Sequence, residues 1–154
     1  MTSCRHSLLG GILAGLVVLS NWTAAAVPTY EEKAVAAVLI GEAGGEGKTG
    51  MTAVAEVILC RAREKQWTIR EVIGFPLAFS CLNETTVEAL IRKNSSHKRY
   101  SEALQIARRM LRSPASFQNI TRGANHFEIK TRTPGWAKGR KPVAVIGRHA
   151  FYRL

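Results

Sequence analysis

The chain has 154 residues with 22 Lys and Arg against 11 acidic residues, all of them Glu, so its formal net charge is +11. The length suits one domain, and 46% apolar against 21% charged residues is typical of a chain that packs a core. Because Asp is absent, an Asp-built EF-hand, a Walker-B or kinase-type magnesium site and a Ser-His-Asp triad are excluded.

Residues 1–26 have the pattern of a secretory signal peptide. Arg5 supplies a positive start, residues 8–19 are an unbroken stretch of 12 apolar or Gly residues, and three alanines end at Ala26. We expect cleavage there, leaving a mature chain of residues 27–154 that is secreted or periplasmic and associated with the cell wall. Twelve apolar residues are short for a membrane span, which needs about 20. An uncleaved anchor is the alternative.

Five helices are predicted next. Two of them begin with capping boxes, formed by Thr29 with Glu32 and by Thr68 with Glu71. A Gly-rich break follows the first helix, and Ser-Pro closes the last one. The predicted helices cover residues 29–41, 48–65, a short stretch from 68, 86–92 and 98–111.

The last part of the chain changes character. Residues 124–129 and 143–153 are rich in aromatic and β-branched side chains, with a Thr-Pro-Gly turn at 133–135 between them. This pattern predicts a small antiparallel sheet. Helices followed by strands make an α+β domain.

Glu42 has an unusual position for a carboxylate. It follows Val35, Val38 and Leu39 at helical spacing, so it extends the apolar face of the first helix near its C-terminal end. Burial and the negative end of the helix dipole both disfavour an ionised carboxylate, as a general acid requires. The alternative is that the helix ends by Ile40 and that Glu42 turns into water.

Cys60 and Cys81 are the two cysteines of the predicted mature chain. In an oxidising compartment they could pair, and closing a loop of this length would stabilise the fold by roughly 3 kcal/mol. Two separate small thiols are an equal alternative.

The positive charge implies an anionic partner. Nucleic acid is not expected, because the chain is predicted to be exported and has no basic helix with interleaved aromatic residues. Anionic polymers of the cell envelope fit the compartment better, and a generally basic, solvated surface is the simpler alternative.

Four ordered blocks resemble the SleB-type cell-wall hydrolases, the spore cortex-lytic enzymes and their relatives in bacteria that make no spores. The blocks are 42–59 (EAGGEG…GM…AVAEVIL), 79–81 (FSC), 123–127 (GANHF) and, after Trp136, 146–152 (IGRHAFY). The resemblance covers about residues 33–154. It implies a small lysozyme-like single domain, mostly helical in its N-terminal part, with a short antiparallel sheet near the C-terminus.

The resemblance also implies an activity. Family members cut peptidoglycan between N-acetylmuramic acid and N-acetylglucosamine, and those with a proposed chemistry are lytic transglycosylases whose acid is the first Glu of the opening motif. That residue is Glu42 here. A transglycosylase needs one carboxyl group, whereas an ordinary glycosidase needs a second one about 5 Å or roughly 6.5–9.5 Å away. We interpret Glu46, the nearest in sequence, as an ion-pair or substrate-orienting residue.

Two positions depart from the family pattern. Gly44 stands where the motif has a basic residue, and Cys60 replaces the Asn that usually ends the second helix. Gly44 therefore supplies no charge to tune Glu42, and Cys60 cannot make the contact of that Asn.

The remaining expected substrate-binding residues come from the C-terminal blocks. Besides Glu46 they are Asn125, His126, Phe127, Trp136 and His149, with peptidoglycan as partner, no cofactor and a monomeric chain. Tyr152 is a further stacking candidate, although it and Phe127 could equally pack the core.

Two alternatives to the transglycosylase stay open. His126 and His149 with Glu42 or Glu46 could form a zinc site, which would make the protein an N-acetylmuramoyl-L-alanine amidase, but their spacing matches no zinc motif. An inactive basic wall-binding module is the third reading.

Overall fold

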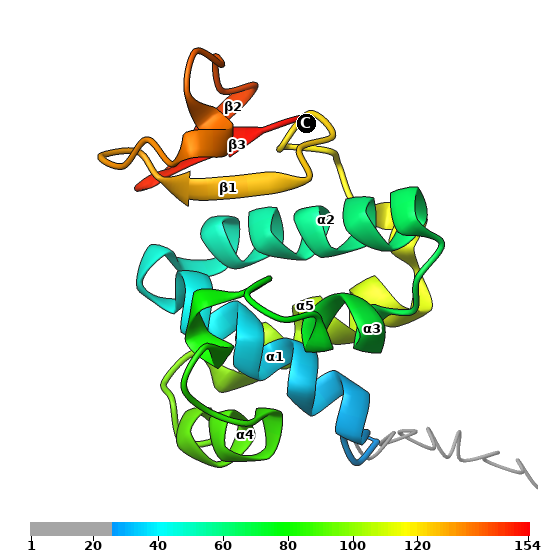
Figure 1. Ribbon diagram of the computed structural model, residues 1–154. Coiled ribbons are helices and arrows are strands. Elements are labelled where there is room, and N and C mark those ends of the chain that lie inside the picture. The colour runs from blue at the N-terminus through cyan, green and yellow to red at the C-terminus, as the bar shows by residue number, and fades with distance from the viewer. Residues whose placement is uncertain (1–25) are drawn as a thin grey trace, which may run out of the picture.

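The computed structural model describes residues 26–154, so the predicted signal peptide lies almost wholly outside the described residues. The chain folds into a mostly helical body followed by a small three-stranded sheet (Figure 1). The predicted α+β class and single small domain are confirmed. The elements are α1 (Tyr30–Ala43), η1 (Gly44–Glu46), α2 (Gly47–Lys65), α3 (Ile69–Gly74), η2 (Ser80–Leu82), α4 (Val87–Asn94), α5 (Tyr100–Arg112), η3 (Pro114–Ser116), β1 (His126–Ile129), η4 (Gly135–Ala137), β2 (Ala144–Ile146) and β3 (His149–Tyr152), where η denotes a short 3₁₀ helix.

The middle layer of the molecule is α2, with the sheet on one side and the other helices on the other (Figure 1). One face of α2 packs into the main helical core through Met51, Val54 and Ile58. Its opposite face packs against the sheet through Ala53 and Val57. The sequence pattern predicted only the first of these apolar faces. The second was not predicted because its apolar residues are small Ala and Val side chains, on the side of the helix where polar residues are usual.

α1 runs through the helical core and is the most buried helix. Its residues 35–39 have no solvent exposure. The helix continues two residues beyond the predicted end, because Gly44 keeps a right-handed helical conformation and the chain reverses only at Gly47, where φ is +70°. Glu42 therefore lies inside α1, not in the loop after it.

The sheet is antiparallel, with strand order β1-β3-β2. The predicted sheet segment 143–153 forms two of the strands, β2 and β3, joined by a tight hairpin at Gly147 and Arg148. Gly147 has a φ of +57°, and a Cβ there would overlap the Glu46 carboxylate. Both features require Gly at this turn.

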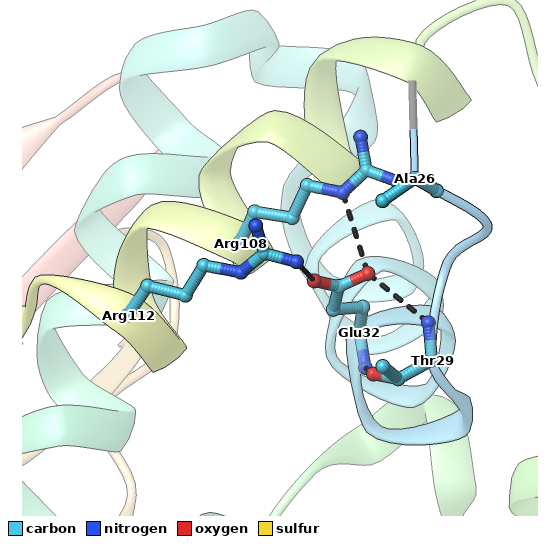
Figure 2. A network of polar contacts seen from close by, with 5 residues as sticks. All are labelled: Ala26, Thr29, Glu32, Arg108 and Arg112. Carbon is cyan, nitrogen blue, oxygen red and sulfur yellow. Dashed lines mark hydrogen bonds and ion pairs between the residues drawn. The ribbon is translucent and has the colours of Figure 1, made fainter. Parts of the chain in front are cut away.

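Both predicted capping boxes are present. In the first, Glu32 is buried and accepts hydrogen bonds from the Thr29 N–H (3.1 Å) and the Arg108 Nε–H (3.3 Å). Arg112 reaches its other oxygen at 2.9 Å, and Arg108 also donates to the Ala26 carbonyl (Figure 2). Burial alone raises the pKa of Glu32, but the Thr29 hydrogen bond and the two guanidinium groups together lower it below its ordinary value. The network ties α1 to α5.

We expect Glu32→Gln to lower the free energy of unfolding at neutral pH by about 1–3 kcal/mol, since it removes a charged acceptor from two arginines. Because the pKa of Glu32 is lowered by folding, the stabilisation is present above the ordinary carboxyl value of about 4.3 and is lost as pH falls through the folded value. Urea denaturation between pH 7 and pH 3 should show the two proteins converging in acid. Glu31→Gln, in the same helical turn, is the control.

Candidate active site

A groove of about 1090 Å³ runs between the helical body and the sheet. Its helical wall comes from the end of α1, the C-terminal half of α2 and the chain between α3 and η2, and its other wall from β1, the loop after it and the β2–β3 hairpin. Among the residues that line it are Glu42, Arg61, Glu64, Trp67, Phe75, Ser80, Asn125, His126, Phe127, Trp136, Arg148 and His149. The groove thus brings together Glu42 and five of the six predicted substrate-binding residues.

Glu42 lies where the buried face of α1 reaches this groove. Val35, Val38 and Leu39, which precede it on the same face, are fully buried, whereas Glu42 is half-buried. The alternative in which the helix ends by Ile40 is wrong. Helical periodicity therefore identified Glu42 as a carboxylate at the boundary between the core and the groove.

Two donors on η2 hold the Glu42 carboxylate. The Ser80 hydroxyl lies 3.1 and 3.3 Å from its two oxygens, and the Cys81 N–H donates to Oε1 at 2.8 Å. η2 can approach this closely because residue 41 is Gly, where a Cβ would lie 2.6 Å from the Cys81 Cβ. The carboxylate is thereby fixed in one orientation.

Arg61 supplies a positive charge near Glu42. Its guanidinium donates to the Asn125 carbonyl at 2.7 Å and to the Ala78 carbonyl at 3.1 Å, and it lies over the Phe79 ring. Burial lowers the pKa of Arg61, and the Glu42 carboxylate opposes that shift. The family motif has a basic residue at position 44, where this chain has Gly. Arg61 on α2 provides a positive charge near Glu42 from a different position.

Cys81 is not equipped to act as a nucleophile. Burial, and then the neighbouring Glu42 carboxylate, raise the pKa of its thiol far above the ordinary value, so the thiolate is disfavoured. Cys60 and Cys81 are both free thiols, so the disulfide alternative is not present in this structure. Cys60 instead lies near Glu64 and the Gly123 carbonyl, each 3.5 Å from its sulfur.

Asn125 positions its neighbour on the groove wall. It is buried, and its side chain accepts from the Leu154 N–H and donates to Glu64 at 2.9 Å. Its Oδ1 also lies 2.9 Å from Nδ1 of His126. Since that oxygen is an acceptor, Nδ1 carries the proton and Nε2 is left as an acceptor. Burial, and then Arg61, lower the pKa of His126, so the ring is neutral over a wider pH range than an ordinary His.

Glu46 does not line the groove but lies behind its sheet wall. Its side chain is 6% exposed, with Oε1 2.8 Å from Nδ1 of His149 and 3.6 Å from Nε of Arg148. The Arg148 N–H donates to its other oxygen at 3.3 Å. Oε1 nevertheless has no partner with hydrogen-bond geometry. Glu46 therefore acts on the hairpin residues His149 and Arg148, which do line the groove.

The aromatic residues divide between groove and core. The Trp136 ring lies 5.2 Å from the His126 ring on the groove wall, and 5.4 Å from Tyr152, which is buried behind it. Phe127 lines the groove and also packs on Phe151.

Residues 45–152 match the cell wall hydrolase family, which is most of the chain. The chain belongs to this family. It is also 31% identical over 120 residues to a spore cortex-lytic enzyme of Halalkalibacterium halodurans, a match that covers 76% of this chain. The matched region spans about a third of that relative, 33% of its length. No solved structure matches the chain significantly.

His126 and His149, which the zinc alternative would bring together, face different partners. His149 faces Glu46 and His126 faces Asn125. Within residues 26–154 no three His, Cys, Asp or Glu side chains are grouped closely enough to hold a metal ion.

Sequence reasoning missed several residues of the groove. Trp67, Phe75 and Leu77 line its helical wall, and Arg61 and Arg132 contribute charge. A usable signal existed for Phe75 and Leu77, since residues 74–77 read Gly-Phe-Pro-Leu, an apolar run at a turn where polar residues are usual.

Proposed function

We propose that this protein cleaves the glycan strands of peptidoglycan between N-acetylmuramic acid and N-acetylglucosamine, as a lytic transglycosylase with Glu42 as its single general acid and base. The observation that carries the proposal is the half-buried Glu42 carboxylate on the groove wall, held at 2.8 Å by the Cys81 N–H and at 3.1 Å by the Ser80 hydroxyl. Membership of the cell wall hydrolase family supports the substrate class.

The reaction needs two proton transfers, one from Glu42 and one to it. Protonated Glu42 gives its proton to the glycosidic oxygen, which leaves as a hydroxyl of N-acetylglucosamine. The resulting carboxylate takes the proton of the muramic acid C6 hydroxyl, whose oxygen bonds to C1 and closes a 1,6-anhydro ring. No water is consumed, and Glu42 ends protonated. Ser80 and the Cys81 N–H stabilise the carboxylate that forms between these two steps.

The surroundings of the other carboxylates favour this scheme over two-carboxylate hydrolysis. Glu46 is directed at His149 and Arg148, behind the groove wall. Glu64 accepts from Asn125 at 2.9 Å, and Glu128 from the N–H that follows it. Glu42 is hydrogen-bonded as well, but its donors are the Ser80 hydroxyl and the Cys81 N–H of η2, and the buried helix α1 presents it on the groove wall.

Substrate contacts are assigned to the groove-lining residues of the sheet wall. Trp136 offers a ring for the apolar face of a sugar, and His126 offers Nε2 as an acceptor for a hydroxyl or amide N–H. His149 and Phe127 lie beside them, while Asn125 positions His126 and Glu46 positions His149.

The charge distribution fits an anionic wall. Residues 130–153 contain seven Lys or Arg and no Glu, and all seven are exposed. Within the described residues, Arg148 alone among them forms an ion pair. Such a surface attracts peptidoglycan carboxylates and other anionic polymers. No helix in residues 26–154 is long and apolar enough to span a membrane. We propose, from the sequence of residues 1–26, that the protein reaches the wall by signal-dependent export.

Analysis of the digestion products tests the proposed reaction. Purified peptidoglycan is incubated with the protein, and the soluble muropeptides are identified by mass spectrometry. We expect anhydro-muramic ends, which are 18 Da lighter than hydrolysed ends because no water is added. Reducing ends would indicate a hydrolase, free stem peptides the zinc amidase, and no release an inactive wall-binding module.

A further inference from the structure

Apolar side chains stand exposed on the connection between α3 and η2. Phe75 is 53% exposed and Leu77 is 85% exposed, and Pro76 between them is exposed as well. Ile73 and Phe79, just outside this run, are buried in the core. Apolar residues gathered at the edge of a groove mark a surface that binds something.

The exposed residues 75–77 lie next to a second aromatic residue, Trp67. The Trp67 ring lies 5.1 Å from the Phe75 ring, with 36° between their planes, and Lys65 Nζ lies 6.0 Å from Trp67. Both rings line the groove that contains Glu42. Together with Pro76 they also line a neighbouring hollow of about 410 Å³ beside α3. The binding surface therefore continues past Trp67 and Phe75.

Leu77 is held in an unfavourable backbone conformation. Its φ is +61°, in the left-handed region that Gly or Asn occupies with less strain. Since the side chain is exposed, burial does not compensate for that strain. Strained backbone with no packing reason is characteristic of binding sites.

We propose that Trp67, Phe75 and Leu77 form a saccharide-binding platform, which holds a sugar of the glycan strand away from the bond cut at Glu42. The proposal rests on the proposed function. The C–H face of a pyranose ring is apolar and packs on aromatic rings, while its hydroxyl and acetamido groups need polar partners. The groove supplies those partners beside the platform in Arg61, Glu64 and Lys65. Because these neighbours can bind the polar groups of a sugar, they favour a sugar over a lipid surface as the ligand.

Binding is measured in an E42Q background, so that the strand is not consumed. The probe is purified long glycan strands with their peptides removed. We expect Phe75→Ser and Leu77→Asn each to weaken binding about three- to tenfold, the loss of one aromatic or apolar contact. Leu77→Asn should not lower the melting temperature, because Asn accepts this backbone conformation. Val145→Thr is the matched control: Val145 is 57% exposed on β2 and does not line the groove.

A kinetic measurement in the protein with Glu42 intact complements the binding. The ratio of kcat/KM for long strands to that for a tetrasaccharide should fall about three- to tenfold in Phe75→Ser. Equal binding by the parent, Phe75→Ser and Leu77→Asn would overturn the platform, even if glycan is cleaved. Phe75-dependent binding without any cleavage would support the platform and overturn the proposed reaction. Loss of binding to phosphatidylglycerol vesicles, with glycan binding intact, would assign the surface to membranes and overturn the proposal.

Discussion

Glu42→Gln is expected to abolish most glycan cleavage while leaving the fold intact. The amide keeps the size of the carboxyl group, and its oxygen can still accept from the Cys81 N–H at 2.8 Å, but it cannot release a proton. General acid catalysis is worth about a hundred- to ten-thousandfold, so the rate of muropeptide release should fall at least that far. The melting temperature should hold or rise, since the amide places no charge beside the core.

Two companion variants separate the role of Glu42 from a general effect of removing charge. Glu84→Gln makes the same chemical change at an exposed position outside the groove, and should retain activity. Glu46→Gln should do less damage than Glu42→Gln, mainly to KM, because Glu46 acts through His149 and Arg148. Full activity in Glu42→Gln, lost on adding a chelator, would instead support the zinc amidase.

The sequence predicted the parts of the fold that depend on local patterns. Both capping boxes form as predicted, because Thr followed three residues later by Glu satisfies the helix N-terminus without help from the rest of the chain. The place of Glu42 on α1 was also predictable, since helical periodicity relates it to Val35, Val38 and Leu39 within a single element.

The contacts that complete the site join residues far apart in the chain, and local patterns do not contain them. Ser80 meets Glu42 across 38 residues, and Arg148 meets Glu46 across 102. The role of Arg61 depends on carbonyls at positions 78 and 125, which only the folded chain brings together. Resemblance to the family pointed to the right blocks but not to these partners.

One such long-range contact predicts a second large effect, at Gly41. A Cβ at this position would lie 2.6 Å from the Cys81 Cβ and 2.9 Å from its sulfur, distances that side chains do not tolerate. Gly41→Ala should therefore push η2 away from α1 and move the Ser80 hydroxyl and the Cys81 N–H off the Glu42 carboxylate. We expect muropeptide release to fall by about a hundredfold, in the range for loss of one well-placed donor. The melting temperature should fall too, by overpacking that costs about 1–3 kcal/mol.

Gly45→Ala is the matched control for this effect. Its added Cβ would meet only the end of the Arg148 side chain, at an ordinary 3.6 Å, so activity and melting temperature should stay close to those of the parent. Cys81→Gly in the Gly41→Ala protein removes the colliding atoms but keeps the backbone N–H that Glu42 needs, and should restore part of the activity. If Gly41→Ala alone cleaved glycan at the parental rate, the contacts from η2 would not be required for catalysis. Rescue by Cys81→Gly, in contrast, would tie the activity of Glu42 to the distance between α1 and η2, independently of any change to the carboxylate itself.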